Sequence, residues 1–200
     1  MDSTSIKKDG KIGIRQFQPQ DAPLLFGAVR ESIADICHYM TWCWPEYSLD
    51  DSHAFIAKSN ADWEQGKQYN FAIVDLRDEL LLGAVGMNRL DRVNRSANVG
   101  YWVRSTKTGR GIATAALRLL AAHGLNDLGF HRLEVLIPTD NPASRRVAEK
   151  AGAQFEGVLR NRVVLANKLH HACLYSLIPE DVSSQVAHLL KEERINTVSL

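Results

Sequence analysis

The stretch that most constrains the fold of this chain is STKTGRGIATAAL, residues 105–117, in which Gly109 and Gly111 flank one arginine. The apolar segment 96–103 before it is typical of a strand, and helix-forming residues follow it without interruption. A strand therefore leads through a glycine-rich loop directly into a helix. The first N–H groups of such a helix have no intrahelical partner, and together with the helix dipole they form an anion-binding site.

This geometry predicts a phosphate or pyrophosphate held by residues 107–114, with Arg110 or Lys107 adding positive charge. Two common nucleotide motifs do not fit. A Walker A loop requires Gly-Lys followed by Ser or Thr, and no Gly-Lys pair in this chain is followed by either residue. A dinucleotide-binding fingerprint requires a third glycine at the position of Thr114. The sequence alone therefore predicts an anion at a helix start without identifying it.

The rest of the chain predicts one mixed α/β domain. Short turns at 77–79 and 166–168 indicate antiparallel hairpins, and the strand–helix–strand segment 96–137 predicts a parallel pair of strands. The expected strands are 12–17, 69–76, 80–90, 96–103, 131–137, 153–165 and 169–178. The expected helices are 20–40, a second one capped by Ser48 or Asp50 and ending near Gly66, 111–129, 141–152, and a last one from Pro179.

Composition argues against several classes of function. The 24 basic and 23 acidic side chains nearly balance, which gives no electrostatic case for a nucleic-acid or membrane partner. The N-terminus lacks the apolar segment of a signal peptide. Three cysteines without a CxxC pair predict buried thiols and a cytoplasmic protein (Cys37, Cys43 and Cys173). His170 and His171 are adjacent in a strand and point to opposite faces, so no metal is expected.

Two segments resemble one family. Residues 106–111 are similar to the Q/R-x-x-G-x-G/A loop of the Gcn5-related N-acetyltransferase (GNAT) superfamily, with Thr106 in place of Gln or Arg. NPASRRVAEKAGAQFEGVLR, residues 141–160, resembles the N-x-x-S-x-x-[V/L]-x-E-K-x-G-F-x-x-E-G segment of RimJ/RimL-like ribosomal-protein alanine N-acetyltransferases, with Ala153 where Phe is usual. The sequence GYWV before the loop also fits that group. The resemblance covers roughly residues 10–178 and leaves the tail 179–200 outside it.

The resemblance implies a GNAT fold over residues 1–200: a twisted, mostly antiparallel sheet with helices on both faces, splayed between its fourth and fifth strands. Acetyl-CoA would lie in that gap. Asn141 would hold the pantetheine amide and Ser144 would protonate the leaving sulfur, which makes these two the expected catalytic residues. The full implied cofactor set is Tyr101, Trp102, Val103, Lys107, Thr108, Gly109, Arg110, Gly111, Ile112, Ala113, Asn141 and Ser144.

Two residues common in the family are missing. Many relatives carry a Tyr four positions after the serine, where this chain has Ala148, and some carry a Glu near the position of Val163. The base that deprotonates the amine is therefore unassigned. Candidates are Glu46, Asp50, His53, Asp91, Glu134 or a chain of waters. An α-amine, with a pKa of about 8, needs a base less than a lysine at about 10.4, which favours a low-pKa acceptor.

The expected function is transfer of an acetyl group from acetyl-CoA to a primary amine by direct attack in a ternary complex. The acceptor would be a protein N-terminal α-amine or a small-molecule amine. The alternative is a CoA-binding module with little or no catalysis, suggested by the two missing residues. Trp42, Trp44 and Tyr47 either border the acceptor site or pack only against one another. Dimers are common in the group, but the acceptor, the base, the oligomeric state and the tail's role remain open.

Overall fold

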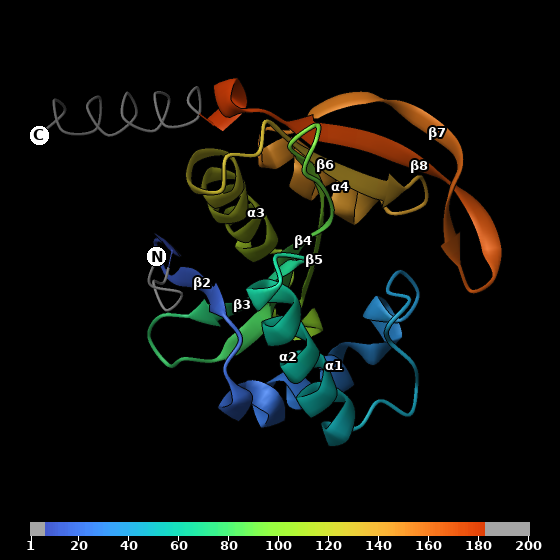
Figure 1. The fold of residues 1–200 in the computed structure, drawn as a ribbon. Helices are drawn as coiled ribbons and strands as arrows, with labels where there is room; N and C mark the ends of the chain where they lie inside the picture. The colour runs from blue at the N-terminus through green and yellow to red at the C-terminus, as the bar shows by residue number, and fades with distance from the viewer. Residues whose placement is uncertain (1–6, 183–200) are drawn as a thin grey trace, which may run out of the picture.

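The computed structural model describes residues 7–182, and its centre is one eight-stranded sheet (Figure 1). The strands are β1 (Lys7–Asp9), β2 (Ile12–Gln16), β3 (Tyr69–Asp75), β4 (Leu81–Asp91), β5 (Ser96–Val103), β6 (Arg132–Pro138), β7 (Gln154–Leu165) and β8 (Lys168–Leu177). Their order across the sheet is β1-β2-β3-β4-β5-β6-β8-β7. Among these described strands, only β5 and β6 pair in parallel, so the predicted mixed and mostly antiparallel sheet is confirmed.

Helices cover both faces of this sheet, as expected. The helices are α1 (Ala22–Ile36), α2 (Leu49–Glu64), α3 (Ile112–Ala122) and α4 (Pro142–Lys150), with 3₁₀ turns η1 (Pro19–Asp21) and η2 (Ser105–Lys107). Helices α1 and α2 lie on one side of the sheet and α3 and α4 on the other (Figure 1). Each side buries its own apolar cluster, with Trp102 of β5 in the first and Val99 in the second. The side chains of β5 therefore alternate between the two faces.

Several predicted boundaries differ from the observed ones. The sequence analysis missed β1, so the predicted fourth and fifth strands are β5 and β6. The predicted helix 111–129 ends at Ala122 and continues as a π-helical turn, η3 (His123–Asp127). In this turn Gly124 packs so closely that an added Cβ would lie 2.9 Å from the sulfur of Met87. The last predicted helix is seen only as residues 179–182, and the rest of it lies outside the described residues.

The parallel pair β5–β6 separates soon after it forms. Register pairs join Ser96 to Arg132, Ala97 to Leu133 and Asn98 to Glu134, and none follows. Beyond them β6 stays paired with β8, while β5 stays paired with β4. The edge of residues 99–103 that faces β6 therefore has no strand partner. This is the splayed gap that the resemblance implied.

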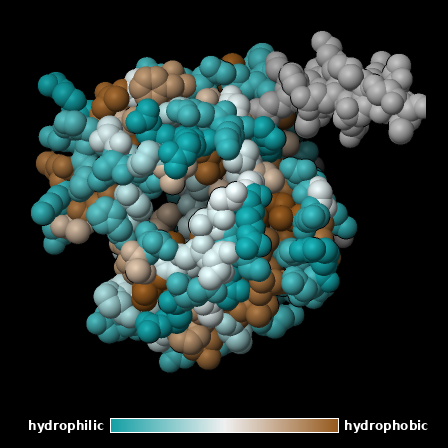
Figure 2. All heavy atoms as spheres, turned by 180° about the vertical axis from the view of Figure 1, so that it is seen from behind, coloured by the Kyte–Doolittle hydropathy of each residue, from teal (hydrophilic) through white to brown (hydrophobic). Residues whose placement is uncertain are grey.

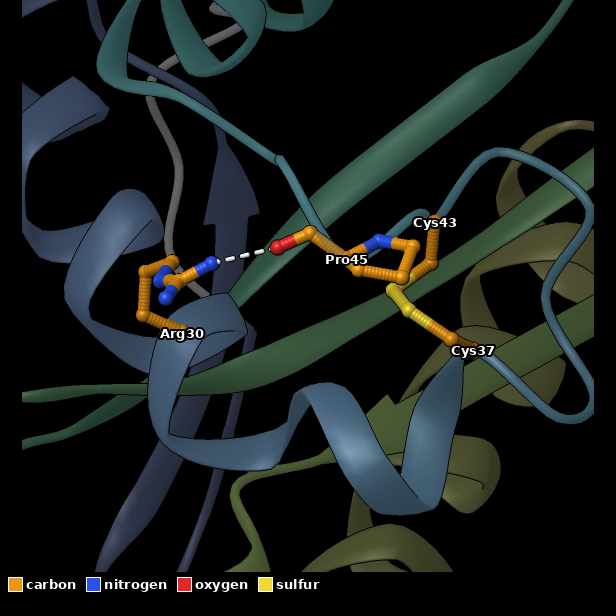
Figure 3. The surroundings of a disulfide bond; sticks show 4 residues. All are labelled: Arg30, Cys37, Cys43 and Pro45. Atoms are coloured by element: carbon orange, nitrogen blue, oxygen red, sulfur yellow. Dashed lines mark hydrogen bonds between the residues drawn. A yellow bond between two sulfur atoms is a disulfide. The ribbon is translucent and has the colours of Figure 1, made fainter.

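The prediction of three thiols is wrong for two of the cysteines, because Cys37 and Cys43 form a disulfide bond (Figure 3). Helix α1 ends at Ile36, and the turn after it brings the two Cα atoms within 4.7 Å, inside the usual range for a disulfide. Arg30 of α1 donates a hydrogen bond to the carbonyl oxygen of Pro45, 2.6 Å away (Figure 3). Cys173 is free and buried, as expected.

The face seen in Figure 2 is mostly hydrophilic, with hydrophobic residues in scattered patches and a hollow near its centre. Within residues 7–182, no helix is long and apolar enough to cross a bilayer.

Candidate active site

A cleft of about 720 Å³ opens where β5 and β6 separate. Its walls come from five segments: the end of α1, strand β5, the loop before α3, strand β6 and the start of α4. Most of the residues that the resemblance implied line it: Tyr101, Trp102, Val103, Lys107, Thr108, Gly109, Gly111, Ile112, Ala113, Asn141 and Ser144. Arg110 is the exception and does not line the cleft. The fold thus gathers residues from β5, α3 and α4 that lie up to 43 positions apart in the sequence.

The loop that leads from β5 into α3, residues 104–111, is called the phosphate loop below. Gly109 and Gly111 have φ angles of +73° and +79°, in the left-handed region that favours glycine. Gly111 is the N-cap of α3 and makes no side-chain cap bond. The first backbone bond to this end of the helix runs from Ala115 N to Gly111 O, at 3.0 Å. The preceding N–H groups of α3 therefore have no partner within the helix, as the sequence predicted, and their binding of an anion stays a prediction.

The start of α4 forms the opposite wall of the cleft. Asn141 is the N-cap of this helix, and its Oδ1 accepts a hydrogen bond from Ser144 N at 3.0 Å. Within residues 7–182, the side-chain nitrogen of Asn141 donates no hydrogen bond to another residue. Asn141 can therefore fix the helix start with its oxygen while its amide N–H groups remain for a ligand in the cleft.

A phenol from β5 reaches across to this wall. The hydroxyl of Tyr101 lies 2.9 Å from the carbonyl oxygen of Ser144 and 2.9 Å from Ser144 Oγ. Burial raises the pKa of Tyr101 to about 12, so the phenol is protonated at neutral pH. The sequence analysis placed Tyr101 in the cofactor set without giving its hydroxyl a role. The signal for its side-chain role was the alternation along 96–103, which places Tyr101 on the α4 side of the sheet.

The end of α1 borders the other part of the cleft. Tyr39 and Met40 line it, and the Tyr39 hydroxyl donates to the carbonyl oxygen of Asp140 at 3.3 Å. Residues on either side of Tyr39 are held by the disulfide between Cys37 and Cys43. The turn after α1 thus contacts the loop between β6 and α4. The sequence analysis missed both lining residues, because no motif marks them.

The aromatic residues after this turn pack together. The ring of Trp42 lies 6.0 Å from that of Trp102 and 6.1 Å from that of Tyr47, and Trp44 lies 6.0 Å from Tyr47. None of Trp42, Trp44 and Tyr47 lines the cleft. Their contact with an acceptor stays a prediction.

None of the five candidate bases lines the cleft (Glu46, Asp50, His53, Asp91 and Glu134). Asp91 instead accepts bonds from the turn that follows it, which hold its pKa below the usual range, mainly through Asn94. Glu134 pairs with Arg132 at 2.9 Å. Among the described residues, the only carboxylate lining the cleft is that of Asp35, and it accepts a hydrogen bond from Ser105 Oγ. The structure assigns none of these groups as the amine base.

Comparison with known proteins identifies the fold. Residues 11–154 match the model of a family described as an acetyltransferase (GNAT) domain. The chain is 28% identical over 179 residues to the protein YdaF of Bacillus subtilis (strain 168), covering 88% of this chain and 95% of that protein. It is also 28% identical over 150 residues to the ribosomal-protein-serine acetyltransferase of Escherichia coli (strain K12), covering 72% and 83%.

A solved acetyltransferase structure has a similar fold. The microcin C7 self-immunity acetyltransferase MccE, in complex with acetyl-CoA and AMP, superimposes with a TM-score of 0.79 at 26% identity, covering 89% of this chain and 97% of that one. The splayed sheet, the glycine N-terminus of α3 and the family match over most of the chain lead to one conclusion: this chain belongs to the GNAT acetyltransferase family and is an N-acetyltransferase of that type.

Proposed function

We propose that this chain transfers the acetyl group of acetyl-CoA to a primary amine in a ternary complex. The observation that carries the proposal is the unpaired edge of β5, which leads directly into the uncapped N-terminus of α3. An extended amide chain can pair with a free strand edge, and a pyrophosphate can bind at a helix N-terminus. Acetyl-CoA presents both groups in that order, and MccE, which has the same fold, is solved with acetyl-CoA.

Different residues of the cleft would bind different parts of acetyl-CoA. The backbone of residues 101–103 would pair with the pantetheine arm, and the amides of residues 107–113 would hold the pyrophosphate. Lys107 adds positive charge inside the cleft. On the opposite wall, the amide N–H groups of Asn141 would donate to a pantetheine carbonyl. These contacts orient a thioester that is already activated, and positioning of this kind supplies much of the rate.

In the reaction, the amine nitrogen forms a bond to the thioester carbonyl carbon and the carbon–sulfur bond breaks. A backbone N–H of residues 101–103 would stabilise the oxyanion that forms. The thiolate would take its proton from the Ser144 hydroxyl. The amine nitrogen would release one proton to water as the amide forms, and water would return one proton to the serine. Tyr101, which stays protonated at neutral pH, would hold the serine hydroxyl in place. The sequence lacks a tyrosine at position 148, so this phenol reaches the serine from β5 instead of from α4.

For the acceptor we propose a protein N-terminal α-amine, with small-molecule amines as the second class. An α-amine has a pKa of about 8, so a large fraction is neutral near pH 7.5 without a dedicated base. This agrees with a cleft in which no carboxylate has been assigned as a base. The E. coli relative is named as a ribosomal-protein acetyltransferase, which supports a protein acceptor.

A direct assay tests this proposal. Release of free thiol from acetyl-CoA is measured with a panel of N-terminal peptides, polyamines and amino acids, and thermal unfolding is followed with and without CoA. Turnover with an N-terminal peptide supports the full proposal. Turnover only with small amines overturns the protein acceptor. Stabilisation by CoA without turnover would support the CoA-binding module with little or no catalysis. If CoA gives no stabilisation and acetyl-CoA gives no turnover, acetyl-CoA is not the co-substrate.

A further inference from the structure

The first position of the phosphate loop motif, Thr106, departs from its family, and its contacts show what this chain does with that position. Both the backbone N–H and the hydroxyl of Thr106 donate to one oxygen of Glu31 in α1, at 3.2 Å and 2.5 Å. These bonds, the hydroxyl first, hold the pKa of Glu31 below its usual range. Glu31 is therefore an ionised acceptor for two donors of the loop.

The residues on either side of Thr106 are held by the same helix. The backbone N–H of Ser105 donates to Ser32 Oγ at 3.0 Å, and Ser32 is completely buried. The hydroxyl of Ser105 donates to Asp35. Arg104 Nε lies 3.1 Å from the second oxygen of Glu31 as an ion pair. Three residues of α1 therefore hold three consecutive residues at the start of the phosphate loop.

The far side of the loop is left without such contacts. After residue 108 the loop passes through two glycines in the left-handed region, Gly109 and Gly111, and reaches α3 without a side-chain cap. A glycine segment of this kind loses more conformational entropy on ordering than any other. An anchor at residues 104–106 lowers that cost, because it fixes the loop before the ligand arrives.

We propose that Glu31, supported by Ser32 and Asp35, is a positioning residue that orders the phosphate loop for the pyrophosphate of CoA. This inference rests on the proposed function, since it assigns the loop a pyrophosphate. Glu31 does not line the cleft, so it acts through Thr106 and Arg104 and not by contact with the ligand.

The direction in which CoA affinity changes when Glu31 is replaced distinguishes an anchoring role from simple charge repulsion. A carboxylate near an anion site repels the anion, so loss of its charge alone would strengthen binding of CoA. Loss of the anchor would weaken it. Glu31→Ala removes both charge and acceptor, whereas Glu31→Gln removes the charge and keeps an oxygen that can accept from Thr106.

The test measures the affinities of CoA, dephospho-CoA and pantetheine by calorimetry, so it does not depend on turnover. We expect Glu31→Ala to weaken CoA and dephospho-CoA by about tenfold, in line with loss of hydrogen bonds to a charged group. Pantetheine, which lacks the pyrophosphate, should change less than about twofold, since it makes no use of the loop. Glu31→Gln, which loses only the charge and keeps the acceptor, should bind CoA at least as tightly as the wild type does.

Two further variants complete the set. Thr106→Val removes one of the two donors at an exposed position and should weaken CoA by roughly threefold, while Thr106→Ser should not. Glu64→Ala, at an exposed position of α2, removes the same charge elsewhere and should leave all three affinities unchanged. In steady-state assays, Glu31→Ala should raise KM for acetyl-CoA and leave kcat near the wild-type value.

Different outcomes overturn different claims. Tighter binding of CoA by Glu31→Ala, or equal weakening of CoA and pantetheine, rejects the anchor. If Glu31→Ala does not fold, an unchanged CoA affinity in Thr106→Val rejects it as well. Failure of the wild type to bind CoA at all instead rejects the proposed function.

Discussion

The hydroxyl of Tyr101 in β5 lies 2.9 Å from Ser144 Oγ in α4, so a hydrogen bond joins the two walls of the cleft. A second contact of 2.9 Å reaches the carbonyl oxygen of Ser144. The phenol has one hydrogen and two acceptors within reach, so it can bond either oxygen of the serine. Whichever oxygen the phenol bonds, the position of the serine hydroxyl depends on a residue from a different element.

Replacement of Tyr101 by Phe tests this dependence. If Ser144 protonates the leaving thiolate, the loss of the phenol hydroxyl should lower kcat by about tenfold, the effect of one hydrogen bond. The KM for acetyl-CoA should change little. Ser144→Ala should lower kcat at least as far, and the double variant should be no slower than Ser144→Ala alone, because both changes disrupt one unit.

The values of kcat for the wild type, Tyr101→Phe, Ser144→Ala and the double variant show whether the two hydroxyls act as one unit. Additive losses would show that the two hydroxyls act independently. Unfolding in urea provides the control, since the loss of a buried hydrogen bond also costs about 1 kcal/mol of stability.

A carboxylate placed in the first turn of α3 should block the cofactor without harming the helix. Ala113 lines the cleft at the helix N-terminus, where an acidic side chain is favourable for the helix dipole. Ala113→Glu should therefore fold normally and lose stabilisation by CoA, because its charge repels the pyrophosphate. The glutamine of Ala113→Gln has nearly the same size as glutamate but no charge, so this variant should lose much less of the stabilisation by CoA.

Thermal shift with and without CoA measures both properties in one experiment. Equal losses in the two variants would mean that bulk, and not charge, blocks the site. A similar change at Gly111 would be harder to interpret, since its φ of +79° makes any side chain there strained.

Reduction of the disulfide should lower stability. The bond between Cys37 and Cys43 closes a loop with a sequence separation of 6, for which chain entropy predicts about 2 kcal/mol. In a dithiol reductant the melting temperature should fall by roughly 4–8 °C. The variant with both cysteines replaced by serine should melt at the lower temperature with or without reductant. A wild-type melting temperature that does not respond to the reductant would contradict the bond in solution.

Acid should remove the stabilisation supplied by Glu156. Arg132 donates to this carboxylate at 2.7 Å and Ser176 at 2.6 Å, and these bonds, Arg132 first, lower its pKa to about 2. A folded pKa below the unfolded value of about 4.3 means that the stabilisation is complete above pH 4.3. It is lost as the pH falls from there toward 2.

The matched variant is Glu156→Gln. Because the ion pair is partly exposed, the free energy of unfolding of the wild type should exceed that of Glu156→Gln by about 1 kcal/mol or less at pH 7. Urea unfolding from pH 7 down to pH 2.5 should show this difference shrinking below pH 4.3. A difference that stays constant with pH would show that the charge of Glu156 contributes nothing.

Much of the site was predictable because its determinants are local. Gly109 and Gly111 mark a strand-to-helix loop by spacing alone, and their left-handed backbone is a property of glycine. Asn141 and Pro142 mark the start of α4 in the same way, since capping and first-turn preferences act within a few residues. The family resemblance then implied that the anion is the pyrophosphate of acetyl-CoA, which the residues alone could not name.

The remaining features depend on contacts between distant segments. No local rule joins Tyr101 to Ser144 or Glu31 to Thr106 in the way that a cap joins neighbours. The C-terminal bound of α3 was also mistaken: the helix ends at Ala122 and continues as a π-helical turn, in which Gly124 packs against Met87 of β4.

By itself, then, the sequence determined the order of the strands and helices after β1 and the glycine loop at the start of α3, and its motifs indicated the family. Local backbone preferences and hydrophobic periodicity decide the elements and the loop, and both can be read along the chain. Only the tertiary structure decided how the phosphate loop is anchored and which phenol reaches Ser144. Those pairings depend on where α1 and α4 pack on the twisted sheet, and the chain order does not specify that packing.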